Sequence, residues 1–249
     1  MSKPRITLEI CTASAEDCVA AEQGGADRIE LNCALMLGGL TPSLGCLHEA
    51  LAAARIPIIA MIRPRAGGFC YSATDFKVMQ RDLELALSAG AAGIAFGILN
   101  ADGTIDRERC RQIISLCAGR QVVFHRAFDV VPSPLEALDQ LVDLGVTRVM
   151  TSGQEASAYN GASQIAEFIR YAAGRIEILP AGGINRFTVA DVISRTGCNQ
   201  IHASLSTSRK DESVLARSQV SFGGTLKPPE NEFTVTDPGG VAGLRRLLD

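Results

Sequence analysis

The chain has 249 residues, 47% of them hydrophobic, and its 24 basic and 27 acidic side chains give a formal net charge of −3. This mixed charge offers no basic surface for nucleic acid or an anionic membrane. No apolar run approaches the roughly 20 residues of a membrane-spanning helix, and residues 1–5 lack the apolar segment of a secretory signal. The eight cysteines form no dense framework, which indicates reduced thiols. We therefore expect a soluble, cytoplasmic protein without nucleic-acid or membrane partners.

A glycine followed within a few residues by an apolar strand recurs four times, at Gly25, Gly90, Gly145 and Gly197. Each glycine follows a helical pattern, where a left-handed residue ends a helix most easily. Four further strands are predicted between these copies, at residues 6–10, 58–62, 122–124 and 176–179. Eight strands alternating with helices predict an α/β fold, a single parallel eight-stranded (β/α)8 TIM barrel over residues 1–249. A doubly wound open sheet is the alternative, but no Gly-x-Gly-x-x-Gly turn follows the first strand.

Capping residues mark the predicted helix starts. Ser14 and Ser133 each precede an acidic residue at capping-box spacing. Three prolines are predicted just inside a helix: Pro42, Pro134 and Pro238. The polar stretch 206–236 fits neither pattern, and we expect an irregular excursion before the last helix, at the surface or in an oligomer contact.

Polar side chains gather where the predicted strands end. The strand over 122–124 runs directly into His125 and Arg126, and the strand over 58–62 runs into Arg63. A desolvated guanidinium needs a partner, so these cations indicate a bound anionic or polar group. In a (β/α)8 barrel these strand ends form the ligand-binding face. The candidate catalytic residues are Glu9, Arg63, His125, Arg126 and Asp129. The candidate ligand-binding residues are Glu30, Asn32, Arg65, Ser152, Gly182, Gly183, His202 and Ser204.

Each pattern at this face has a functional and a structural interpretation. Backbone amides at Gly182 and Gly183, before a helix capped by Asn185, could hold a phosphate or carboxylate, or the glycines could serve a tight turn. The arginines could bind a planar anion, or pair permanently with carboxylates inside the barrel. His125 with a nearby carboxylate could be a general acid or base, or a hydrogen-bonded structural residue.

The cysteines divide by position. Four lie in helical patterns and are expected to pack as small hydrophobic residues: Cys18, Cys46, Cys110 and Cys117. Three fall near strand ends or the following loops: Cys11, Cys33 and Cys70. The absence of any Cys-x-x-Cys pair disfavours a closed zinc site, whereas two thiolates brought together by the fold could bind Cu(I).

Eight short motifs keep a shared order along nearly the whole chain. They occupy residues 8–11, 24–31, 38–43, 62–72, 124–129, 151–153, 181–183 and 202–204. In these motifs the chain resembles the copper homeostasis protein family CutC. The resemblance implies a single eight-fold barrel, a cytoplasmic location, a homo-oligomer (dimer or tetramer) and copper handling, but no established catalytic activity.

The resemblance also implies a copper site, with Cu(I) held by Cys11 and a second cysteine. Family members often carry that cysteine directly after Glu-Leu, where this chain has Asn32 and then Cys33. Cys33 is thus the second candidate ligand, although a shift of one residue along a strand turns a side chain to the other face. The chain also departs from the family at Phe69, where an Asp is favoured.

Two classes of function stay open from the sequence. One is copper binding and participation in copper homeostasis. The other is an enzyme acting on a small anionic metabolite, a carboxylate or a phosphate, at the barrel mouth, because a ring of carboxylates, arginines and histidines is hard-ligand chemistry. A scaffold without chemistry is a third option, which a strongly charged mouth disfavours.

Overall fold

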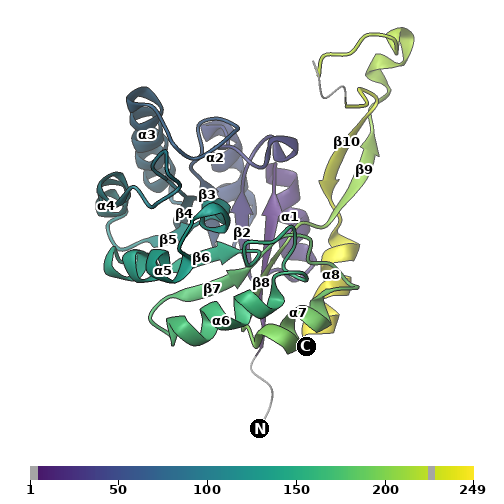
Figure 1. Cartoon of the computed structure of the whole chain (residues 1–249). Coiled ribbons are helices and arrows are strands. Elements are labelled where there is room, and N and C mark those ends of the chain that lie inside the picture. Colours follow the sequence, from purple (N-terminus) through teal and green to yellow (C-terminus); the bar gives the residue numbers. More distant parts are fainter. Residues whose placement is uncertain (1–4, 224–227) are drawn as a thin grey trace.

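The computed structural model describes residues 5–223 and 228–249, and it forms a barrel with helices around it (Figure 1). The barrel strands are β1 (Thr7–Thr12), β2 (Arg28–Leu31), β3 (Ile58–Met61), β4 (Gly93–Phe96), β5 (Gln121–Phe124), β6 (Arg148–Thr151), β7 (Glu177–Pro180) and β8 (Gln200–Ala203). The α-helices are α1 (Ala15–Gln23), α2 (Leu44–Ala53), α3 (Ala73–Ala89), α4 (Arg107–Leu116), α5 (Pro134–Asp143), α6 (Ala162–Ala172), α7 (Val189–Thr196) and α8 (Pro238–Leu248). Residues 1–4, which the prediction about a signal segment concerned, lie outside the described part.

The sheet is parallel throughout and nearly closed. Its order is β7-β6-β5-β4-β3-β2-β1-β8, so β1 pairs with both β2 and β8. At the remaining seam, the Gln200 side chain of β8 donates to the Glu177 carboxylate and the Ile178 carbonyl of β7. The predicted (β/α)8 barrel is therefore confirmed. None of the helices in the described ranges has the length and apolar character needed to cross a bilayer.

Only some of the helix ends carry the capping residues that the sequence predicts. Gly90 and Gly197 end α3 and α7 in the left-handed conformation, as predicted. The Ser14 hydroxyl accepts the Asp17 amide at 3.0 Å and caps α1, but Ser133 makes no such bond at α5.

Two of the prolines predicted inside helices do occupy a first turn, Pro134 and Pro238. The prediction for Pro42 was wrong, because α2 begins two residues later, at Leu44. Its N-cap is Ser43, whose hydroxyl accepts the Cys46 amide.

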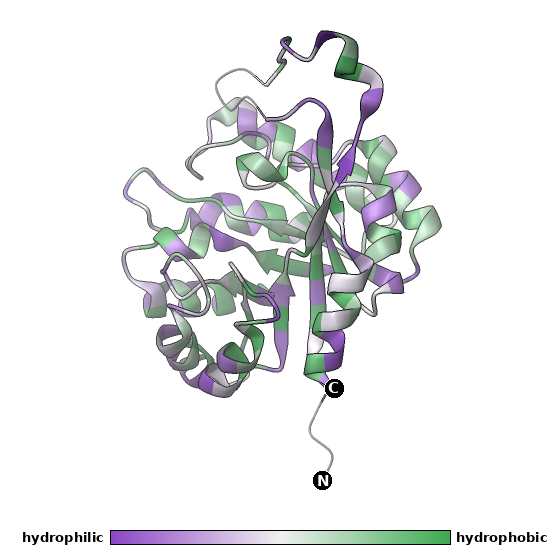
Figure 2. Cartoon of the chain, turned by 90° about the vertical axis from the view of Figure 1, so that its right-hand side faces the viewer, coloured by the Kyte–Doolittle hydropathy of each residue, from purple (hydrophilic) through white to green (hydrophobic). Residues whose placement is uncertain are grey.

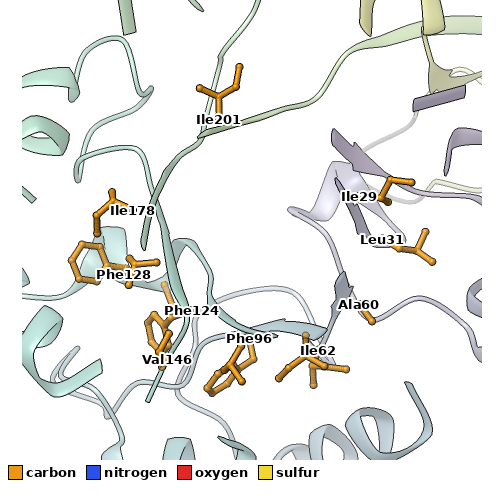
Figure 3. Close-up of a cluster of buried hydrophobic side chains, with 14 of the residues drawn as sticks. Ile29, Leu31, Ala60, Ile62, Phe96, Phe124, Phe128, Val146, Ile178 and Ile201 are labelled. Carbon is orange, nitrogen blue, oxygen red and sulfur yellow. The ribbon is translucent and has the colours of Figure 1, made fainter. Parts of the chain in front are cut away.

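Alternation along the strands produces two separate hydrophobic clusters. Every second side chain points outward and packs beneath the helices, as do Ile29, Leu31 and Phe124 (Figure 3). The intervening side chains point into the barrel, where those of β3 to β7 form a smaller apolar cluster that includes Met61 and Met150. On β1, β2 and β8 the inward positions are charged or polar instead, and the buried Arg148 side chain of β6 joins them by bonding Gln200 and Glu177.

The stretch 206–236 is an arm rather than an irregular excursion. Strands β9 (Ser206–Lys210) and β10 (Glu232–Thr236) pair antiparallel and project away from the barrel (Figure 1). The short 3-10 helix η3 (Glu212–Arg217) lies beyond them, and residues 224–227 fall outside the described part. Much of the arm is hydrophilic (Figure 2), and β9 is exposed along its whole length. The expectation of an irregular segment was therefore wrong for both strands, whose Ser, Thr and charged residues were interpreted as loop composition.

Candidate functional site

A cavity of about 470 Å³ opens at the carboxyl ends of the barrel strands. Nine of the predicted site residues line it: Cys11, Glu30, Asn32, Arg63, His125, Arg126, Asp129, His202 and Ser204. Six do not line it: Glu9, Cys33, Arg65, Ser152, Gly182 and Gly183. A volume of this size is typical of small-molecule sites.

The side chains of Cys11, Glu30 and His202 bring three different donor atoms together on one wall of the cavity. The thiol sulfur, a carboxylate oxygen and an imidazole nitrogen all lie within 4.8 Å of one another. Strand register produces this grouping, because Cys11 of β1 is the direct partner of Glu30 on β2, and His202 comes from β8 on the other side of β1. All three donors occupy inward positions on adjacent strands.

Glu9 lies within the barrel, in contact with the imidazole rather than at the cavity surface. It is 1% exposed, bonds Nδ1 of His202 at 2.8 Å and pairs with Arg28. Burial alone would raise the pKa of Glu9, but the His202 hydrogen bond and the Arg28 charge outweigh it and lower the pKa to about 2. Glu9 is therefore an ionised carboxylate that orients the His202 ring.

The three clustered donors have pKa values that reflect their burial. Desolvation raises the pKa of Cys11 and of Glu30, and the Glu9 charge adds to both shifts. Desolvation would lower the pKa of His202, but the charges of Glu30 and Glu9 outweigh it and raise that pKa well above its usual value. One Glu30 oxygen, Oε1, is buried without a hydrogen-bond partner.

Asn32 and Cys33 lie on opposite faces of the chain, as strand parity requires. The Asn32 amide faces inward and donates to Glu30 at 2.9 Å and to the Cys11 sulfur at 3.4 Å. Cys33 instead forms a bridge with Leu40, and its thiol donates to the carbonyl of Thr41 at 3.1 Å. The fold therefore does not bring Cys33 into the group around Cys11.

The two arginines after β3 differ in position and in partners. Arg63 is 7% exposed and lines the cavity, where its guanidinium donates to the carbonyls of Leu37, Gly39 and Gly67. Arg65 turns away and pairs with Asp75 at 3.1 Å. Among the described residues no carboxylate lies within 4.0 Å of Arg63. Within the described part of the chain, Arg63 therefore forms no ion pair.

His125 is a neutral hydrogen-bond donor rather than a base. Its Nδ1 accepts the Ala127 amide at 3.1 Å, which places the proton on Nε2, and Nε2 is buried without a partner. Burial and the nearby charge of Arg63 lower the pKa of His125 to about 3. The ring contacts Phe69, with 5.1 Å between the centroids. The predicted acid–base partnership with a carboxylate is absent around His125 in the described structure.

Asp129 and Arg126 serve mainly to hold each other and the β6 end. Arg126 donates to Asp129 and to the Ser152 hydroxyl, both at 2.8 Å. Asp129 also accepts the backbone amides of Ser152 and Gln154. Its carboxylate therefore already has several donors, which leaves little capacity for a ligand.

The glycine turn after β7 does not line the cavity. Gly182 and Gly183 have positive φ angles of 100° and 71°, so the turn needs glycine for conformation. Helix α7 begins only at Val189, with Thr188 as its N-cap, and Asn185 instead accepts the Phe187 amide within the preceding turn. The prediction of Asn185 as a helix cap was therefore wrong.

Sequence reasoning missed the apolar part of the wall. The cavity is also lined by Leu35, Met61, Phe69, Val130 and Met150. Strand parity carried a signal for two of them, because Met61 and Met150 occupy inward positions, the last of β3 and the last but one of β6. The loop residue Phe69 carried no comparable signal.

Similarity to known proteins extends over most of the chain. A model of the CutC family matches residues 6–207. A family protein CutC from Treponema denticola is 50% identical over 230 residues, covering 92% of this chain and 94% of its own. The copper homeostasis protein cutC homolog of Mus musculus is 42% identical over 240 residues, covering 96% of this chain and 88% of its own.

A solved structure supports the same assignment. The crystal structure of a CutC protein from Streptococcus agalactiae superposes with a TM-score of 0.76 at 33% identity, covering 79% of this chain and 97% of that one. Fold, family model and full-length relatives agree, and the chain therefore belongs to the CutC family.

Proposed function

We propose that this protein binds copper, as Cu(I), at the carboxyl ends of β1, β2 and β8, and takes part in copper homeostasis. The observation that supports the proposal is the group of Cys11, Glu30 and His202 donor atoms within 4.8 Å of one another. The orphaned Glu30 Oε1 adds to it, because a buried carboxylate oxygen without a donor suits a cation.

The chemistry of the donors suits copper. A thiolate and an imidazole are ligands that Cu(I) accepts, and a carboxylate is the harder oxygen ligand that Cu(II) tolerates. Met61 and Met150 line the same cavity from β3 and β6, and we do not count them among the copper ligands. We therefore assign the soft ligands to Cys11 and His202, and leave Cys33 outside the site.

The surroundings of the imidazole resemble those of metal-binding histidines. Such histidines commonly donate their second ring nitrogen to a carboxylate, which fixes the ring and raises its basicity. Here Glu9 bonds Nδ1 of His202, while Nε2 lies 3.9 Å from Glu30. Nε2 is therefore the ring atom that would face copper.

The test is an anaerobic titration of fully reduced protein with Cu(I) against a chromogenic chelator. We expect saturable binding that weakens at least about tenfold in both Cys11→Ser and His202→Asn. The matched control is Cys33→Ser, a neighbouring thiol that bonds the Thr41 carbonyl, and it should bind as the unmodified chain does. Failure to compete for Cu(I), or equal loss in Cys33→Ser, would refute the proposal.

The proposal includes a cytoplasmic location and assembly into a homo-oligomer. All eight cysteines are free thiols, which suits a reducing compartment. The arm carries exposed apolar side chains, among them Leu215, Phe222 and Phe233, which are 56%, 78% and 47% exposed. Apolar groups on a projecting arm suit a contact with a second copy of the chain.

A further inference from the structure

In the described part of the chain, half of the buried side-chain polar atoms that lack a hydrogen-bond partner belong to residues lining the cavity. Among the described residues, eight buried side-chain atoms lack a hydrogen-bond partner. Four of them belong to residues that line the cavity: Glu30, Asn32, Arg63 and His125. A buried polar group without a partner destabilises a fold by about 1–3 kcal/mol, so such a concentration points to a ligand that the cavity is built to bind.

Two of these residues are donors, and both contact one aromatic ring. The guanidinium carbon of Arg63 lies 5.3 Å from the centroid of Phe69, and the imidazole of His125 lies 5.1 Å from the same centroid. The two donors therefore belong to one region of the wall, defined here as the Arg63–Phe69–His125 subsite. Its donors follow β3 and β5, whereas the proposed copper ligands lie on β1, β2 and β8.

The charge of this subsite is positive. Among the described residues Arg63 has three carbonyl partners and no carboxylate within 4.0 Å, and its Nε is buried without a partner. His125 contributes a neutral Nε2–H, so it adds a donor without adding charge. One full positive charge with an adjacent N–H donor matches a monoanion, because carboxylates form strong bonds with guanidinium groups and accept a second donor on the other oxygen.

The rest of the cavity distinguishes a carboxylate from a phosphate. Phosphate sites usually supply several backbone amides, as at a helix N-terminus, but the turn at Gly182 and Gly183 does not line this cavity. The Glu30 carboxylate also lines it and, when ionised, would repel a dianion more strongly than a monoanion. The apolar side chains of Met61 and Met150, 5% and 3% exposed, form part of the wall and suit a carbon skeleton.

We propose that the Arg63–Phe69–His125 subsite binds the carboxylate of a small organic acid, whose carbon skeleton packs against the methionine wall of the cavity. This site is separate from the copper ligands and does not require the metal. It gives the barrel mouth a second ligand of a defined chemical class.

The test uses the full chain, free of metal, in isothermal titration calorimetry with four probes: benzoate, butanoate, benzamide and inorganic phosphate. We expect at least one of the two acids to bind with a Kd of about 1 mM or tighter. Benzamide, which has the shape of benzoate without its charge, should bind at least about tenfold more weakly, and phosphate should not saturate. Binding of neither acid, equal binding of benzamide, or preferential binding of phosphate would each overturn the proposal.

Variants locate the binding within the cavity. His125→Asn keeps an oxygen that can accept the Ala127 amide but loses the Nε2–H donor. The variant should raise the Kd for the acid at least about tenfold. Arg63→Met should do the same, and if it fails to fold because three carbonyls lose their donor, His125→Asn still decides. Arg81→Gln is the matched control, since Arg81 is exposed on α3, does not line the cavity and pairs with Glu84. Equal loss in Arg81→Gln, or no loss in His125→Asn, would overturn the assignment of the subsite.

Because every titration is made without metal, its outcome is independent of the copper experiment. An acid bound normally by a chain that fails to bind Cu(I) would leave this inference standing and refute the proposed function. A chain that binds Cu(I) but neither organic acid would refute only this inference.

Discussion

The carboxylate of Glu9 bonds Nδ1 of His202 at 2.8 Å and thereby directs Nε2 of the same ring toward Glu30, 3.9 Å away. Strand register produces the contact, because Glu9 and His202 are direct partners across β1 and β8. Glu9 also pairs with Arg28, so the carboxylate is fixed from two sides. The orientation of the proposed copper-binding imidazole therefore depends on a residue that does not itself reach the cavity.

Glu9→Gln tests this positioning role. The neutral glutamine amide cannot replace the charged carboxylate that orients the His202 ring. Loss of such a supporting partner typically weakens metal binding about 10- to 100-fold. We expect that loss in the Cu(I) competition experiment, with the stoichiometry unchanged. A structural role alone would lower stability without changing affinity, so both quantities are measured on the folded protein.

The control for Glu9→Gln is Glu16→Gln, which removes an exposed carboxylate paired with Arg209 on the arm. An exposed ion pair contributes about 0–1 kcal/mol, so neither copper affinity nor stability should change appreciably. Unchanged copper affinity in Glu9→Gln would contradict the positioning role.

Strand periodicity made a large part of the site predictable. Inward positions alternate, so Glu30 and Asn32 had to share a face that Cys33 could not. The barrel rule then placed the strand ends of β1, β2 and β8 side by side.

The choice of partners could not be predicted in the same way. Arg63 and Arg65 are two residues apart, and each donates to three loop carbonyls, yet only Arg65 also pairs with a carboxylate, that of Asp75. Those partners depend on how the loops after β2 and β3 fold. The same is true of Asp129, whose several backbone donors come from the end of β6.

His125 predicts a specific loss of stability in acid. Its pKa is about 3 in the folded chain, whereas an unfolded histidine titrates near 6.5. Between these values the unfolded chain binds a proton that the folded chain does not, so the free energy of unfolding falls as the pH falls from about 6.5 toward 3. The slope from this group is about 1.4 kcal/mol per pH unit, which amounts to about 3 kcal/mol at roughly pH 4.5.

Urea unfolding of the unmodified chain and of His125→Asn, at several pH values between about 7 and 4.5, measures this contribution. The asparagine does not titrate, so the two stability profiles should converge or cross as the pH falls. Carboxylates contribute equally to both chains and cancel in the difference. Parallel profiles would mean that His125 is not held neutral by its surroundings.

Gly97 predicts a steric requirement beneath His125. A Cβ at this position would lie 2.5 Å from the His125 ring and 2.7 Å from the Ala127 side chain. Gly97→Ala should therefore displace the imidazole and lower the free energy of unfolding by about 1–3 kcal/mol, the usual effect of overpacking. Thermal and urea unfolding measure the loss.

Gly68→Ala is the matched control for Gly97→Ala, because nothing lies within 4 Å of its added carbon and its φ is not positive. The free energy of unfolding of Gly68→Ala should equal that of the unmodified chain or exceed it by about 0.4–1 kcal/mol, since alanine restricts the conformations of the unfolded chain. If Gly97→Ala were as stable as Gly68→Ala, the close packing around the His125 ring would be disproved.

The arm predicts the outcome of an assembly experiment. Its apolar side chains Leu215 and Phe222 are 56% and 78% exposed, so replacing both with serine should leave folding of the barrel intact. If the arm contacts a second copy, L215S/F222S should shift the chain from an oligomer to a monomer in size-exclusion chromatography with light scattering. The matched control replaces Phe187, which is 76% exposed and lies on the loop after β7, with serine, and should leave the mass unchanged. A monomeric unmodified chain would refute the proposed oligomer, whereas an oligomer that survives L215S/F222S would place its interface elsewhere on the barrel.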